Sequence, residues 1–139
     1  MQAKCILRDC RVEIWEIVTN MDKEELKERT KKFALEVIKF VEKLPRTKTG
    51  NVIGNQLLRS ATSIGANYRS ACRARSHADF ISKISIAEEE ADESLYWLEL
   101  AVESGLVDKQ IAEKLTQEAN ELTSIFAASR KTAVKRRGR

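Results

Sequence analysis

The chain has 139 residues and a mass of 15.8 kDa, and its 25 basic against 21 acidic side chains give a net charge of +4. Glycine and proline are scarce while alanine, leucine, glutamate and lysine are abundant, which favours one all-α domain and argues against a sheet protein. No apolar run approaches the roughly 20 residues that a membrane span needs, and charges interrupt the first twenty residues, where a signal peptide would need an apolar stretch.

We therefore expect a cytoplasmic protein. Its three cysteines are odd in number and lack the spacing of metal ligands. We expect reduced thiols and neither a disulfide framework nor a zinc site at Cys5, Cys10 and Cys72.

Residues 1–21 do not continue the pattern that follows them, and two interpretations stay open. Their apolar side chains, among them Val12, Ile14 and Trp15, could form a short helix or strand docked on the rest of the chain. Alternatively, the segment is an extension upstream of a natural start at Met21, because Asp22 is a good N-cap for the helix that follows.

Helical periodicity predicts two helices in the first half of a domain at residues 22–130. The first runs from about Lys23 to Leu44, and Pro45 ends it. The second covers about residues 51–75, and a close helix crossing would explain the glycine at position 65, which costs about 1 kcal/mol against alanine in a helix.

Two further helices follow. One runs from His77 to Glu103 after the N-cap Ser76, and Gly105 suits the left-handed position behind its last turn. The other begins after Asp108, and we expect it to fray after Ala133 into a basic tail at residues 131–139. Short connections make sequential helices antiparallel, so the predicted fold is an all-α, up-down-up-down four-helix bundle with a short extra N-terminal segment.

The four expected core faces follow the helical period. They comprise Leu26, Thr30, Phe33, Val37, Phe40, Val41 and Leu44; Leu57, Ala61, Ile64, Tyr68 and Cys72; Phe80, Ile84, Ala87, Ala91, Leu95, Leu98 and Val102; and Ile111, Leu115, Ala119, Leu122, Phe126 and Ala133.

Three stretches carry a resemblance to a known family: QLLRSATSIGANY, a helix start at SHADF, and IAEEEADESLYWLELAVESGLV. From about residue 25 to 130 the chain resembles the bacterial four-helix-bundle family encoded in intervening sequences of 23S ribosomal RNA genes. It is also similar to the accessory variability protein of diversity-generating retroelements. The resemblance implies a ring-shaped homopentamer, and the retroelement relatives bind nucleic acid and a reverse transcriptase. The family motif continues with an acidic residue and glycine, whereas here Arg69, Ser70 and Ala71 follow.

Two groups of basic residues are candidates for binding RNA or DNA through backbone phosphates. One is an arginine stripe on the second helix. The other is the C-terminal cluster, whose alternative is a merely solvated, disordered end. Together they comprise Arg69, Arg73, Arg75, Arg130, Lys131, Lys135, Arg136, Arg137 and Arg139.

Arg59, the arginine of the family motif, is a candidate for a structural ion pair. We expect it to form an intersubunit network with Glu89 and Glu93, and a phosphate contact is the alternative. For Arg69 and Arg73 the same two roles stay open.

Apolar side chains on the outward face of the third helix predict an oligomer interface at Ile86, Tyr96, Trp97 and Leu100. The alternative is that residues 1–20 cover them within one subunit.

Catalysis is not expected. The acids of the third helix would need Glu-x-x-His units on facing helices to hold a di-metal site, and His77 is the one histidine. His77 should be exposed, no catalytic triad or phosphate-binding loop is evident, and we expect no cofactor and no metal.

The sequence therefore predicts a non-enzymatic, homo-oligomeric bundle, a pentamer by resemblance, that binds RNA or DNA. The alternative is a protein-interaction scaffold, for example an accessory subunit of a reverse transcriptase, in which the arginines pair subunits. A metal-dependent enzyme is a distant third hypothesis.

Overall fold

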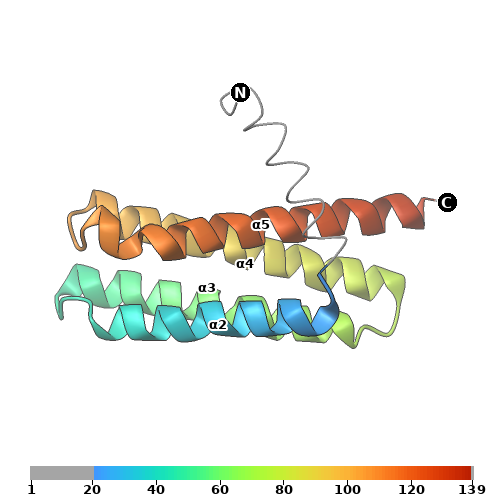
Figure 1. Cartoon of the computed structure of the whole chain (residues 1–139), viewed down its shortest axis with the longest axis horizontal. Coiled ribbons are helices and arrows are strands. Elements are labelled where there is room, and N and C mark those ends of the chain that lie inside the picture. Colours follow the sequence, from blue (N-terminus) through green and yellow to red (C-terminus); the bar gives the residue numbers. More distant parts are fainter. Residues whose placement is uncertain (1–20, 139) are drawn as a thin grey trace, which may run out of the picture.

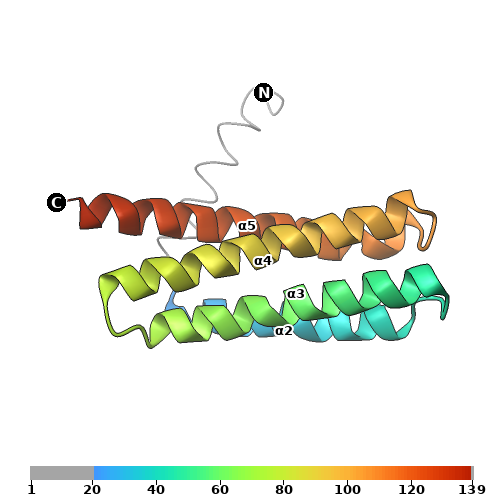
Figure 2. The same ribbon diagram turned by 180° about the vertical axis from the view of Figure 1, so that it is seen from behind.

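The computed structural model describes residues 21–138, and these form four long helices joined by short turns. The helices are α2 (Lys23–Glu42), α3 (Lys48–Cys72), α4 (His77–Glu103) and α5 (Lys109–Arg137). Figure 1 shows α2 and α5 in front, and Figure 2, from behind, shows α3 and α4 in front. The predicted antiparallel four-helix bundle is confirmed. Residues 1–20, with both interpretations of that segment and with Cys5 and Cys10, lie outside the described residues.

Side-chain caps start three of the four helices. The carboxylate of Asp22 accepts a hydrogen bond from the Glu25 N–H at 2.8 Å, and the Ser76 hydroxyl accepts one from the Asp79 N–H at 3.0 Å. Thr47 caps α3 by accepting from the N–H of residue 50. This cap was missed from the sequence, and α3 therefore begins three residues before the predicted start. At its other end, α3 stops at Cys72, before the predicted end at Arg75.

The end of α4 has the predicted glycine geometry. Gly105 has φ +79°, and its N–H donates to the carbonyl of Val102, while the next N–H, of Leu106, donates to the carbonyl of Ala101. This pair of bonds is the Schellman motif, which satisfies carbonyls that the helix leaves without partners. It turns the chain sharply into α5.

The core follows the predicted faces with one error. Ile111 is 61% exposed, and its neighbour Ala112 is buried instead. α5 is rotated so that Ala112, Ala119 and Leu122 face inward, which leaves Ile111 at the edge toward α2. Val41, Cys72, Phe80, Leu95, Val102 and Leu115 are only partly buried, and the other predicted core residues are buried.

A close crossing of α2 and α3 explains Gly65. A Cβ at this position would lie 3.2 Å from Oγ1 of Thr30, which is itself fully buried. The Thr30 hydroxyl donates to carbonyls of its own helix, so burial leaves it satisfied. The predicted close approach is confirmed.

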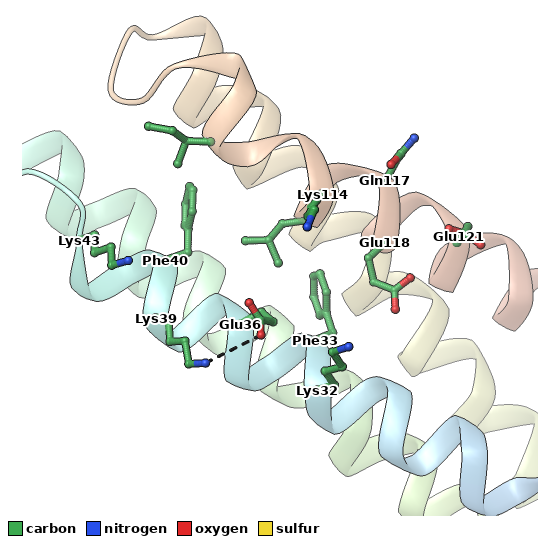
Figure 3. Close-up of a pocket in the computed structure, with 12 residues that line it drawn as sticks. Lys32, Phe33, Glu36, Lys39, Phe40, Lys43, Lys114, Gln117, Glu118 and Glu121 are labelled. Atoms are coloured by element: carbon green, nitrogen blue, oxygen red, sulfur yellow. Dashed lines mark ion pairs between the residues drawn. The ribbon is translucent and has the colours of Figure 1, made fainter.

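The packing of the four helices is uneven. α3 with α4 and α4 with α5 share long contact surfaces, whereas α2 and α5 touch much less. A groove of about 620 Å³ therefore runs between α2 and α5 (Figure 3).

Candidate nucleic-acid interface

Two of the predicted basic groups meet at one end of the bundle. The α3–α4 turn carries Arg73 and Arg75, and α4 then begins at His77, whose Nε2 lies 2.7 Å from the carbonyl oxygen of Ala133 in α5. This contact places the turn beside the last turns of α5, as Figures 1 and 2 also show. We call this set of six cations the basic end: Arg73, Arg75, Lys131, Lys135, Arg136 and Arg137.

The basic residues of α5 are presented by a helix and not by a frayed tail. α5 continues through Arg137, so the expectation that it frays after Ala133 is wrong. Ala133 is buried against the bundle and holds this part of the helix in place. Cations in the last turn also interact favourably with the negative end of the helix dipole. Arg139 lies outside the described residues.

The side chains of the basic end are not engaged within the subunit. All six residues are exposed, and none forms an ion pair with another residue among positions 21–138. None of the six is held in an ion pair by a described acid, and their exposed side chains are open to solvent.

Arg130 differs from these residues. Its Nε donates to Glu88 of α4 at 2.5 Å and its Nη2 donates to the second carboxylate oxygen at 3.3 Å. The hydrogen bond from Arg130 to Glu88 raises the pKa of Arg130. This two-point contact ties α5 to α4, so Arg130 is occupied inside the subunit although the sequence grouped it with the phosphate-binding cluster.

Arg69 lies one turn before the basic end on α3, exposed at a shallow groove between α2 and α3. Lys27 and Lys31 of α2 line the same groove, and Lys27 is paired with Glu24 at 3.1 Å. Glu24 and Glu28 also line this groove, so its charge is mixed and Arg69 is the cation that α3 adds to it.

Arg59 forms a structural ion pair, but within one subunit. It reaches across from α3 to two acids of α4, with Glu93 at 2.5 Å and Glu90 at 3.3 Å. Within the subunit Glu90 takes the place predicted for Glu89, which is exposed, and a network between subunits stays a prediction. The neighbouring Ser60 is buried, and its hydroxyl accepts from the hydroxyl of Ser94 in α4 at 2.9 Å.

We expect Arg59→Gln to change the acid titration of Glu93. The hydrogen bond from Arg59 holds the pKa of Glu93 below its ordinary value of 4.5. The ionised carboxylate therefore stabilises the fold above the unfolded-state pKa, and this contribution is lost as pH falls through the lower folded-state pKa. Without Arg59, the pKa of Glu93 should rise toward 4.5, with less than about 1 kcal/mol lost at pH 7 because the pair is exposed.

NMR titration of the carboxyl carbon of Glu93 measures this shift. Lys48→Gln removes one exposed cation from the first residue of α3, which has no ion pair with Glu93. This variant is the control, since it should leave the titration of Glu93 unchanged. An unaltered pKa in Arg59→Gln would show that the pair does not form in solution.

A second ion-pair cluster was missed from the sequence. Arg29 of α2 donates through two nitrogens to Glu118 of α5, at 2.9 and 2.6 Å, and lies 3.1 Å from Glu121. The hydrogen bond to Glu118 raises the pKa of Arg29, against the effect of its partial burial. The spacing of the two acids places them on one helix face, but their distant partner cannot be read from periodicity. This cluster bridges the seam where α2 and α5 otherwise pack poorly.

The residues predicted as an oligomer interface lie on α4, and they differ in exposure. Tyr96 is 54% exposed, while Ile86, Trp97 and Leu100 are partly buried. The rings of Tyr96 and Trp97 meet edge to face at 5.0 Å between centroids, and the Trp97 indole donates to Glu93 at 3.2 Å. Trp97 is therefore engaged inside the subunit, and Tyr96 is the aromatic side chain offered to solvent.

The described residues contain no cluster of three or more histidines, cysteines and acids arranged to hold a metal ion. Across residues 21–138, no helix is both long and apolar enough to cross a membrane. His77 is exposed, as predicted, and acts as a tether to α5.

The fold and this surface define an all-α four-helix-bundle protein with a concentrated positive end. The chain belongs to the 23S rRNA-intervening sequence protein family, whose sequence profile matches residues 22–128. It is similar to the crystal structure of a protein of unknown function from the S23 ribosomal protein family of Bacteroides thetaiotaomicron, with 34% identity and a TM-score of 0.74 over 80% of this chain and 99% of that chain. A search of curated proteins found no match.

Proposed function

We propose that this protein is a non-enzymatic homo-oligomer, a pentamer by its family resemblance, that binds RNA or DNA through backbone phosphates. The observation that carries the proposal is the basic end: six exposed cations from two separate chain segments, none neutralised by a described residue. Arginine binds phosphate bidentately, and lysine binds it as a point charge.

The surface suits binding without base readout. The cations lie on a helix end and a turn, and the exposed ring beside them, His77, is held by the carbonyl of Ala133 and is not presented as a stacking platform. Each subunit offers few phosphate contacts, so affinity per subunit should be modest. An oligomer that presents several copies to one strand would gain avidity without new contacts.

The test is the salt dependence of binding to a fluorescent single-stranded oligonucleotide, with Lys135, Arg136 and Arg137 replaced together by glutamine. Each phosphate contact contributes about 0.7 to the slope of log K against log salt for a single strand. Loss of three contacts should therefore reduce the slope by about 2 for each engaged subunit and weaken binding at low salt.

A matched variant separates the basic end from net charge alone. Arg46→Gln, Lys48→Gln and Lys109→Gln remove the same charge from exposed sites at the opposite end of the bundle. This variant should keep most of the wild-type slope of log K against log salt. Equal losses in both variants, or no loss in either, would contradict a site at the basic end.

A protein-interaction scaffold, such as a reverse transcriptase accessory subunit, is the second candidate. The exposed Tyr96 beside Trp97 favours it, because aromatic anchors are typical of interface hot spots. An oligomer that takes up no oligonucleotide at low salt would support this candidate over the first.

A further inference from the structure

The groove between α2 and α5 is rimmed by lysines. Lys32, Lys39 and Lys43 lie along the α2 wall, and Lys114 lies on the α5 wall (Figure 3). Of these four, only Lys39 has an acidic partner among the described residues, Glu36 at 3.9 Å.

The groove is also lined by two further acids and by an apolar floor. Glu118 and Glu121, which also line it, are engaged by Arg29. Phe33 and Phe40 form the floor and are themselves almost buried, so the apolar surface open to a partner belongs to Ile111 and the partly buried Leu115. The groove thus offers apolar contacts between walls in which three of the four lysines have no acidic partner among the described residues.

α4 carries a surface of the opposite character. An exposed row along its outward side, which we call the acidic ridge, comprises Glu89, Asp92, Tyr96, Glu99 and Glu103. Their spacing of three, four, three and four residues keeps them on one helix face. None of the four acids forms an ion pair with a described residue, and Lys83 is the one basic residue of α4. Tyr96, the central member, is 54% exposed.

We propose that the acidic ridge of one copy of this chain seats in the lysine-rimmed groove of a second copy, with Tyr96 against Ile111 and Leu115. This proposal deepens the homo-oligomer of the proposed function by naming the two surfaces that meet. The fully buried centre of such a contact is one aromatic side chain on aliphatic ones, and the charges around it are opposite in sign, as in interfaces with a well-defined orientation.

The dimensions and positions of the two surfaces agree with this contact. The α2 wall from Lys32 to Lys43 is about 16 Å long at 1.5 Å per residue, and the ridge from Glu89 to Glu103 is about 21 Å long. The groove opens on the α2–α5 side shown in Figure 1, and α4 lies toward the side shown in Figure 2. Ridge and groove are different patches, so the contact is heterologous and can repeat from copy to copy until a ring closes.

Charge reversal tests the contact on the full chain. The groove variant carries Lys43→Glu and Lys114→Glu, and the ridge variant carries Asp92→Lys and Glu99→Lys. All four sites are exposed, and none has an ion-pair partner among the described residues. Mass is measured by light scattering after size exclusion, without nucleic acid, and circular dichroism and the melting midpoint confirm that each variant is folded.

The wild type should be an oligomer and each variant alone should be a monomer. An equimolar mixture should assemble again with alternating copies, because the intact ridge of the groove variant fits the intact groove of the ridge variant and the reversed ridge fits the reversed groove. A chain with all four substitutions should assemble again. A monomeric wild type, or variants that keep the wild-type mass, would overturn the proposal.

The glutamine variant of the basic end provides the control that separates the two proposals. It should keep the mass of the wild type, because Lys135, Arg136 and Arg137 lie outside both surfaces. If oligonucleotide binding fails while the groove and ridge variants dissociate as expected, the assembly proposal stands and the nucleic-acid proposal falls. If a monomeric wild type binds the oligonucleotide, the nucleic-acid proposal stands and the assembly proposal falls.

Discussion

Phe126→Ala is expected to lower the free energy of unfolding by about 3–5 kcal/mol, the largest effect of any single change considered for this chain. Phe126 is fully buried on α5, and its ring centroid lies 5.7 Å from that of Tyr68 on α3. Truncation removes the transfer free energy of the ring and leaves a cavity among four helices that can relax only in part.

Urea titration followed by circular dichroism measures this loss, and two variants calibrate it. Phe126→Leu retains most of the buried volume and should cost clearly less. Val52→Ala should change stability by no more than about 0.5 kcal/mol, because Val52 is 53% exposed and lies outside both the groove and the acidic ridge. A cost at position 52 close to that of Phe126→Ala would contradict the view that burial sets the size of the loss.

Phe126→Ala should also lower the pKa of the Tyr68 phenol. Burial raises the pKa of the Tyr68 phenol, so its neutral form is favoured in the folded protein. Truncation of Phe126 loosens the packing that buries the phenol, so the pKa of Tyr68 should move back toward its ordinary value. The absorbance of tyrosinate on alkaline titration, with Tyr68→Phe subtracted as the reference, measures this shift independently of the unfolding experiment.

Gly50→Ala is the second substitution with a large expected effect, and its sign opposes helix propensity. In a helix interior this change usually gains about 1 kcal/mol. Here a Cβ would stand 2.1 Å from the carbonyl oxygen of Pro45 and 3.2 Å from its carbon. Because the obstacle is backbone, the α2–α3 turn itself must shift, and we expect a loss of about 1–3 kcal/mol.

Gly54→Ala is the matched control on the same helix. There the new Cβ would meet only side-chain ends, Val41 Cγ1 at 3.2 Å and Leu44 Cδ1 at 3.3 Å, which can give way by a few tenths of an ångström. Urea titration should find Gly54→Ala less damaging than Gly50→Ala. The reverse order would show that the α2–α3 turn tolerates the shift and that the side-chain packing does not.

The helices and their antiparallel order could be predicted because the information that determines them is local. Asp22 and Ser76 cap their helices with their own side chains, Pro45 and Gly105 end the preceding helices, and the apolar period shows which face turns inward. Thr47 was missed because a threonine cap carries little signal without the turn geometry around it. Ile111 was misplaced because its period is consistent with the core face, and only the packed rotation of α5 shows that Ala112 is buried in its place.

The sequence by itself therefore determined an all-α bundle, its family and the positive charge of its two basic segments. Tertiary structure alone decided which of those charges are available. Arg59 and Arg130 each lie within reach of acids more than 30 residues away and are engaged, whereas none of the cations of the basic end forms an ion pair with a described acid. Periodicity shows which face of a single helix is apolar. Whether an arginine meets an acid of another helix depends on how the two helices are rotated and aligned against each other. That alignment is set by packing of the whole core, to which every helix contributes at once.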